Sequence, residues 1–469
     1  MVMPIVPALI SWLAWASTPA GAGENLKDRI EAALAPIGGG ATVAVALIAA
    51  PAGGAVADGL PAGDPRAEGF LPETLDKIKP MLEDAVTRRK VAGASTLIAR
   101  RGKVVHRASA GMRDVEAGRP VDASTLFRIA SMSKPITSAA VMILVDDGKV
   151  GLDDPVAKFL PEFRSPAVVA RRDGGAGPAA TVPASGPITV RHLLTHTSGL
   201  SYRFSGRPVV GPLYVESGVS DGLVETPGTI GDNVRRLARL PLWNHPGAEW
   251  EYGLSVDVLG RLIEVASGRP LDAFLRDRLT GPLGMADPAF VVPAAGRDRL
   301  AALYTPGEDG TIRRAPASPV QIGPLVFSAS FPTWDTGTYH SGGAGLTSTV
   351  DDYARFLQMI LNRGELDGVR VLRPETVGAM ARDQIGGLTI PAWGNGDGFG
   401  YGFGVVREGN RDRDPAGAGA LSWTGFFHTY FWVDVRHQVI GIFMAQIAPA
   451  RGLEIVPNFK RLAYEALVD

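Results

Sequence analysis

The sequence predicts an α/β (α+β) protein in which an antiparallel sheet flanked by helices is joined to an all-helical lobe. Three observations lead to this prediction. Strand-like segments occur near both ends of the folded region, and the last part of the chain, from residue 341, carries both helix and strand patterns. Between them, residues 151–340 are rich in proline and contain several short helical patterns. We therefore expect one sheet built from both ends of the chain.

The composition is that of a large globular protein and excludes several function classes. The chain has 469 residues, of which 45% are hydrophobic and 20% are charged, which is enough for a large core. Its formal net charge of -1 gives no indication of nucleic-acid binding. The absence of cysteine excludes disulfides, thiolate metal sites and a cysteine nucleophile. The folded region lacks an apolar run long enough for an integral membrane span, and nothing indicates the oligomeric state.

Residues 1–69 are predicted to be a signal-like leader and a linker without stable structure. Residues 2–16 are nearly all apolar, as in a signal peptide, but they lack a basic segment before the apolar run. A second candidate signal lies within residues 27–57, and residues 51–69 have the Pro, Gly and Ala content of a linker. We expect a periplasmic or secreted protein, with a cytoplasmic location as the alternative.

The α/β lobe is predicted to begin with residues 70–150. Helical periodicity covers residues 73–90, and two strand patterns at 95–101 and 103–109 indicate a hairpin. An amphipathic helix is expected to follow Ser131, because apolar residues recur there on one helical face. These elements place Ser131 at the start of a helix that follows a hairpin.

Residues 151–340 are predicted to form the helical lobe. Helices are expected at 256–267 and 271–279, directly after Tyr252, and residues 165–187 have the Ala, Gly and Pro content of a surface loop.

Residues 341–469 are predicted to complete the α/β lobe. The first expected element is a helix at 350–363, and a closing helix is expected at 455–468. Strands are predicted between these two helices, at residues 401–406, 420–424, 428–435 and 438–446.

The motif with the clearest chemical meaning is Ser131-Met132-Ser133-Lys134. Residues three apart lie on the same side of a helix, so the Lys134 amine can reach the Ser131 hydroxyl. A serine becomes a good nucleophile when a neighbouring base takes its proton. The N-terminus of the helix also supplies unpaired N–H groups that favour a developing oxyanion. The motif indicates a serine hydrolase, whereas the alternative is a serine that only caps a helix.

Further segments place this motif in a recognisable context. They are residues 127–137 around the motif itself, 147–156, Leu-Leu-Thr-His-Thr-Ser-Gly-Leu at 193–200, and Ser-Gly-Gly-Ala-Gly-Leu at 341–346. With these segments, the chain from residue 70 to residue 469 resembles the β-lactamase-like serine hydrolases. That group contains class C β-lactamases, D,D-peptidases and family VIII carboxylesterases.

The resemblance implies a fold and a set of site residues. The fold would be β-lactamase/transpeptidase-like, with the site between an α/β lobe and a helical lobe. Ser131 would be the nucleophile, and Lys134 and Tyr252 would share the role of general base. The backbone N–H groups of Ser131 and Phe426 would hold the oxyanion, Gly425 would belong to the third motif, and no cofactor would be needed.

Two departures from the lactamase pattern suggest the substrate class. The tyrosine motif ends in Leu254 where lactamases usually carry asparagine, and the third motif begins with Trp423 where they carry lysine. Both changes predict a less charged pocket, and a Trp-x-Gly motif resembles family VIII carboxylesterases. We therefore expect a small-molecule ester with a short acyl chain as substrate. The alternatives are a β-lactamase or a D-amino-acid peptidase/penicillin-binding protein, and a binding protein that acylates without turnover.

Three histidines lie near the motifs. His196 is expected to have a packing or hydrogen-bonding role, because the resemblance makes its segment structural. His340 and His428 lie close to site-forming motifs, and the sequence assigns them no role. The chain has no His-Glu-x-x-His motif, so a zinc protease is not supported.

Overall fold

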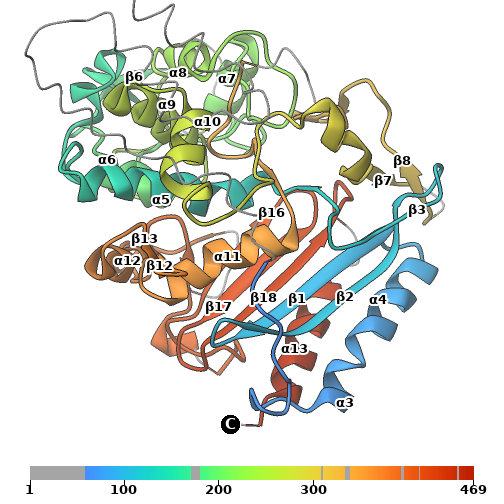
Figure 1. Cartoon of the computed structure of the whole chain (residues 1–469). Coiled ribbons are helices and arrows are strands. Elements are labelled where there is room, and N and C mark those ends of the chain that lie inside the picture. The colour runs from blue at the N-terminus through green and yellow to red at the C-terminus, as the bar shows by residue number, and fades with distance from the viewer. Residues whose placement is uncertain are drawn as a thin grey trace, which may run out of the picture. The chain divides into compact units, whose positions relative to one another are not determined.

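An antiparallel sheet at the centre of the fold takes its strands from both ends of the folded region (Figure 1). The computed structural model describes residues 59–170, 180–307, 310–332, 338–391, 396–410, 412–450 and 454–468. The strand order is β14-β15-β16-β17-β18-β1-β2-β3. The bounds are β1 Gly93–Arg100, β2 Lys103–Asp114, β3 Arg119–Pro120, β14 Gly398–Phe399, β15 Gly404–Val405, β16 Leu421–Gly425, β17 Thr429–Asp434 and β18 Val439–Ala445. Because β1 pairs with β18, the predicted sheet shared by both ends is confirmed.

Helices cover both faces of this sheet. Ile442 and Phe443 are neighbours on β18, and they enter two different hydrophobic clusters, as the alternation of side chains along a strand requires. The cluster that contains Phe443 is formed with α4 (Ile78–Thr87) and α13 (Ile455–Ala466). The cluster that contains Ile442 is formed with α11 (Val350–Leu361), which crosses the other face in Figure 1. A sheet covered on both faces explains why all of β1 is buried.

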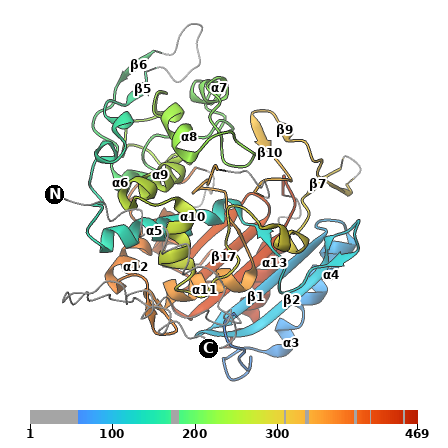
Figure 2. The same cartoon turned by 45° about the horizontal axis from the view of Figure 1, so that its top comes forward.

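Helix α5 (Ser133–Asp146) joins the sheet to the helical lobe, and its residues are buried from Ser133 to Leu144. It packs against α9 (Ser255–Ser267), and Figures 1 and 2 both show it between the sheet and the helices that follow it. The other helices are α3 Pro72–Leu75, α6 Val190–Leu194, α7 Val210–Glu216, α8 Ile230–Leu237, α10 Leu271–Leu275 and α12 Pro374–Met380. A single π-helical turn, Arg276–Thr280, continues α10.

Short two-stranded sheets complete the described structure. They are β4 Phe127–Arg128 with β11 Thr347–Ser348, β5 Ala167–Val169 with β6 Thr181–Pro183, β7 Tyr304–Pro306 with β8 Ile312–Arg314, β9 Val320–Ile322 with β10 Leu325–Phe327, and β12 Glu365–Leu366 with β13 Val369–Arg370. Three of these pairs lie in residues 151–340, so that region contains hairpins as well as helices.

Some predicted elements differ from the observed ones for local reasons. The helix expected at 73–90 is split into α3 and α4, because the ring of Pro80 would collide with the carbonyl of Asp76 in one continuous helix. The loop expected at 165–187 contains β5 and β6, and residues 171–179 lie outside the described residues. The strand expected at 401–406 is reduced to β15, because the chain turns at Gly402, whose φ is 91°.

The end of the predicted linker belongs to the folded unit. Residues 1–58, with both candidate signal segments, lie outside the described residues. Leu60 is only 4% exposed and joins the core, and Glu68 accepts a hydrogen bond of 2.7 Å from Lys103 Nζ. Residues 59–69 therefore pack against the sheet, since a buried leucine and a buried glutamate hold them there. Throughout the described ranges, no helix has the length and apolar character needed to cross a membrane.

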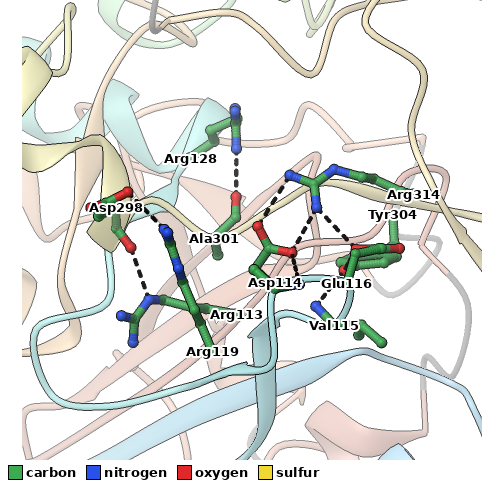
Figure 3. Close-up of polar contacts among 11 residues, drawn as sticks. Arg113, Asp114, Val115, Glu116, Arg119, Arg128, Asp298, Ala301, Tyr304 and Arg314 are labelled. Atoms are coloured by element: carbon green, nitrogen blue, oxygen red, sulfur yellow. Dashed lines mark hydrogen bonds and ion pairs between the residues drawn. The ribbon is translucent and has the colours of Figure 1, made fainter.

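A group of ion pairs and hydrogen bonds holds the paired strands β7 and β8 against the end of β2 (Figure 3). Arg314 Nη1 lies 2.7 Å from Asp114 Oδ1 and 2.9 Å from Glu116 Oε2. The Tyr304 hydroxyl donates a hydrogen bond of 2.7 Å to Glu116.

In the same view, the buried Arg128 donates a hydrogen bond of 2.8 Å to the backbone carbonyl of Ala301. Burial lowers the pKa of Arg128 to about 10, so it stays charged at neutral pH and anchors the chain just before Ser131.

Candidate active site

Ser131 lies in a 3-10 turn, Ala130–Met132, directly before α5. The residue before it, Ala130, has a φ of +42°, which is uncommon for a residue with a side chain and is typical of functional sites. Ser131 itself is half-buried at the surface of a cavity. The predicted helix start is therefore observed, with Ser131 in the turn that leads into it.

Lys134 is fully buried beside Ser131. Its Nζ atom donates a hydrogen bond of 3.0 Å to Ser131 Oγ and another of 2.8 Å to the carbonyl of Gly343. The same atom lies 4.7 Å from the ring centroid of Tyr252 and 5.7 Å from that of Tyr202. The three residues proposed from the sequence as the catalytic group are thus brought together.

The ring of Tyr252 is held by aromatic neighbours. It stacks on Trp250 with an interplanar angle of 7° and a centroid distance of 5.8 Å. Trp423 lies at 5.6 Å, Tyr202 at 5.3 Å and His196 at 5.0 Å between ring centroids. Such packing restricts the ring and leaves the part of Tyr252 that lines the cavity in a defined place.

The cavity beside Ser131 is small and mostly apolar. Its volume is about 170 Å³. The residues that line it are Ser131, Tyr202, Phe204, Asp221, Leu223, Tyr252, Ala344, Thr424, Gly425 and Phe426. Asp221 is the one charged side chain among these lining residues. The lining residues therefore include no cation that could pair with an anionic group.

Gly425 brings the end of β16 against the turn that carries Ser131. A Cβ atom at this position would lie 2.1 Å from Thr429 Oγ1 and 2.3 Å from the carbonyl oxygen of Ile129, so only glycine permits the close approach. The next residue, Phe426, lines the cavity and packs its ring against Phe327 at 5.3 Å. Gly425 and Phe426 thus lie at the same cavity as Ser131.

Two predicted lining residues are placed differently. Trp423 is 4% exposed and packs against Tyr252 and Phe399, whereas its neighbour Thr424 is exposed and lines the cavity. Neighbouring side chains on a strand point to opposite faces of the sheet, so Trp423 and Thr424 cannot both line the cavity. Leu254 is fully buried in the core at the start of α9 and does not line the cavity. The apolar wall is supplied by Phe204, Leu223 and Phe426 instead.

The histidines have packing environments. His196 is fully buried against Tyr252 and Trp250, as predicted, and burial lowers its pKa well below the ordinary value. His428 packs against Phe443 at 5.0 Å, and burial lowers its pKa to about 4. His340 stacks on Phe290 at 4.9 Å, and its Nδ1 atom lies 3.5 Å from Asp272 Oδ1. None of these three lines the cavity beside Ser131.

Several residues near the nucleophile were not predicted from the sequence, among them Tyr202, Phe204, Asp221 and Asp257. The first three line the cavity, and Asp257 is buried beside Gly343 and Lys134. Burial raises the pKa of Asp221 to about 7 and that of Asp257 to about 6. Asp257 had one detectable signal, since it is a charged residue within the apolar start of a helix at residues 254–259. Within the described residues, no group of three or more potential metal ligands is found.

Comparisons with known proteins bear on the family and the fold. Residues 78–463 match a family model described as Beta-lactamase. Esterase EstB from Burkholderia gladioli is 37% identical over 363 residues, which cover 76% of this chain and 86% of that protein. The solved structure of EstCE1, described as a hydrolase with promiscuous acyltransferase activity, has a TM-score of 0.73 and 26% identity, covering 85% of this chain and 100% of that one. A LovD6 mutant of simvastatin synthase from Aspergillus terreus has a TM-score of 0.69 and 25% identity, covering 84% of this chain and 95% of its own.

Proposed function

The chain belongs to the beta-lactamase family, and on that premise we propose that it is a serine carboxylesterase that cleaves esters with short acyl chains. The observation that carries the proposal is the contact of 3.0 Å between Lys134 Nζ and Ser131 Oγ at the edge of a small, mostly apolar cavity. The likeness to Esterase EstB and to EstCE1 supports ester hydrolysis.

The proposed reaction has two steps through an acyl-enzyme. Lys134 and Tyr252 share the removal of the Ser131 proton, and the serine oxygen attacks the ester carbonyl. The backbone N–H groups of Ser131 and Phe426 stabilise the oxyanion. Tyr252 then protonates the leaving alkoxide, and a water molecule, deprotonated by the same bases, releases the acid from Ser131. No step requires a cofactor.

The charges around the cavity favour a neutral substrate. Penicillins and cephalosporins carry a carboxylate, and the residues that line this cavity include no cation, because the one charged lining side chain, Asp221, is an acid already paired with Arg203. Leaving a carboxylate without a cation in a mostly apolar cavity is unfavourable. A neutral ester has no such penalty, and its short acyl chain gains contact with Phe204, Leu223 and Phe426.

A comparison of two substrates tests the proposal. We expect kcat/KM for 4-nitrophenyl butyrate to exceed kcat/KM for a chromogenic cephalosporin by about 10²-fold or more, since one uncompensated charge in an apolar site costs several kcal/mol. Ser131→Ala serves as the blank for both reactions. A ratio that favours the cephalosporin would instead support a β-lactamase or peptidase, and a single burst without turnover would support a protein that acylates only.

A further inference from the structure

A buried carboxylate, Asp257, lies behind the Ser131–Lys134 pair and has no part in the mechanism above. It belongs to the first turn of α9 and is 1% exposed. Its Oδ1 atom accepts a hydrogen bond of 3.2 Å from the Tyr339 hydroxyl. Its Oδ2 atom is buried, and the Ser341 hydroxyl and the Gly343 backbone N–H lie close enough to the carboxylate to lower its pKa. A buried carboxylate is costly unless a cation also lies near it, so its presence needs a physical reason.

Gly343 separates this carboxylate from Lys134. The Gly343 carbonyl accepts the hydrogen bond of 2.8 Å from Lys134 Nζ. A Cβ atom on Gly343 would lie 2.7 Å from Asp257 Oδ2 and 3.6 Å from Lys134 Nζ. Together these two distances limit the separation between Oδ2 and Nζ to 6.3 Å. A side chain at position 343 would collide with the carboxylate, so glycine is what allows the anion to lie this close to the amine.

We infer that Asp257 is a positioning residue, whose negative charge acts across Gly343 to hold Lys134 beside Ser131 and to strengthen the lysine as a base. The inference rests on the proposed function, because it takes Lys134 to be the base. An anion near an amine favours the ammonium form, and it makes the amine a stronger proton acceptor.

The other titratable groups around this pair do not replace Asp257. They are Tyr202, Tyr252, Tyr339, His196 and Asp221. Burial raises the pKa of Tyr202 and of Tyr339 well above the ordinary value and lowers that of His196 well below it, so all three are neutral at pH 7.

Asp221 differs from Asp257 because it has a cation of its own. The Arg203 guanidinium lies 2.7 Å from the Asp221 carboxylate. Burial raises the pKa of Asp257 to about 6, and the Ser341 hydroxyl and the Lys134 charge oppose that rise. Asp257 is therefore mainly ionised at pH 7, and Lys134 is the cation that lies near it.

The pH dependence of kcat/KM for 4-nitrophenyl butyrate tests this role in Asp257→Asn. Without the anion the ammonium form of Lys134 is less favoured, so the acid limb of the pH profile, where kcat/KM rises with pH, should move to lower pH by about one unit. The plateau value of kcat/KM at high pH should fall about tenfold, because the lysine is then a weaker base. The matched control is Asp352→Asn, since burial also raises the pKa of Asp352 to about 6 and its carboxylate accepts a hydrogen bond of 2.7 Å from the backbone of Asp287. This control should leave the limb in place.

An acid limb that stays in place, or that moves to higher pH, would overturn the inference, even if activity falls at every pH. Thermal unfolding of each variant establishes that it is folded. If Asp257→Asn does not fold, Tyr339→Phe takes its place, because it removes the donor to Asp257 Oδ1 and keeps the ring. Loss of that donor makes Asp257 easier to protonate, so a smaller shift in the same direction is expected and an unmoved limb overturns the inference. Full esterase activity in Ser131→Ala would instead contradict the proposed function.

Discussion

The two walls of the cavity beside Ser131 are built in different ways. One wall comes from the turn before α5, from the first turn of α5 and from the start of α9, and it supplies the half-buried Ser131 with the buried Lys134 and Asp257 behind it. The other wall comes from the end of β16 and the turn after it, and it supplies close backbone approach and an aromatic surface through Gly425 and Phe426. The first wall depends on the chemistry of its side chains, and the second depends on shape.

This difference separates what substitutions should do on each side. A change in the first wall removes a reacting group but leaves packing nearly unchanged, so it should act on kcat and spare stability. A change in the second wall alters how closely the strand approaches Ser131 or how well an acyl chain is contacted. It should therefore act on stability or on KM.

The largest effect is expected from Ser131→Ala in the first wall. Loss of the nucleophile should lower kcat by a factor of about 10⁵ or more, as with other nucleophile deletions. The unfolding temperature should barely change, because only one half-buried hydroxyl is lost. Ester hydrolysis and thermal unfolding of the purified variant provide the measurements.

The control for this prediction is Ser133→Ala. The Ser133 hydroxyl accepts a hydrogen bond of 3.1 Å from the backbone of Leu346, so its loss should cost about 1 kcal/mol of stability and little activity. If Ser133→Ala were inactive and Ser131→Ala active, the assignment of the nucleophile would be wrong.

In the second wall, Gly425→Ala should produce a smaller loss of activity and a clear loss of stability. Because the added methyl would overlap Thr429 Oγ1 and the Ile129 carbonyl, the strand must move away from Ser131. We expect the free energy of unfolding to fall by about 1–3 kcal/mol, as in other overpacked sites, together with a fall in kcat/KM. Gly409→Ala is the matched control, since its Cβ would have no neighbour within 4 Å. Equal unfolding midpoints in urea for the two variants would contradict the role given to Gly425.

The smallest effect is expected from Phe426→Ala, which removes part of the aromatic surface and keeps the backbone N–H. Loss of apolar contact worth about 1–2 kcal/mol should raise KM for a butyrate ester by roughly 5- to 30-fold and change kcat little. For an acetate ester, which has a shorter acyl chain, KM should rise less. If kcat fell and KM stayed constant, the Phe426 side chain would belong with the chemistry of the first wall, and the comparison between the walls would fail.

The sequence by itself determined the features that depend on short-range patterns. Ser131 and Lys134 are three residues apart at a helix start, and this spacing alone places the amine beside the hydroxyl. Strand and helix periodicity likewise predicted the shared sheet, since each pattern spans only a few neighbouring residues. The order of motifs along the chain indicated that Tyr252 belongs with Ser131, and the structure places its ring beside Lys134.

The tertiary structure alone decided which side chains face the cavity. Trp423 and Thr424 are neighbours in sequence, but the face of the sheet that packs against the core determines that Thr424 lines the cavity and Trp423 lies beneath Tyr252. Leu254 enters the core for the same kind of reason. Asp257 approaches Lys134 because Gly343, distant from both in sequence, leaves room between them. Such placements depend on contacts between distant segments, and no local pattern in the sequence records them.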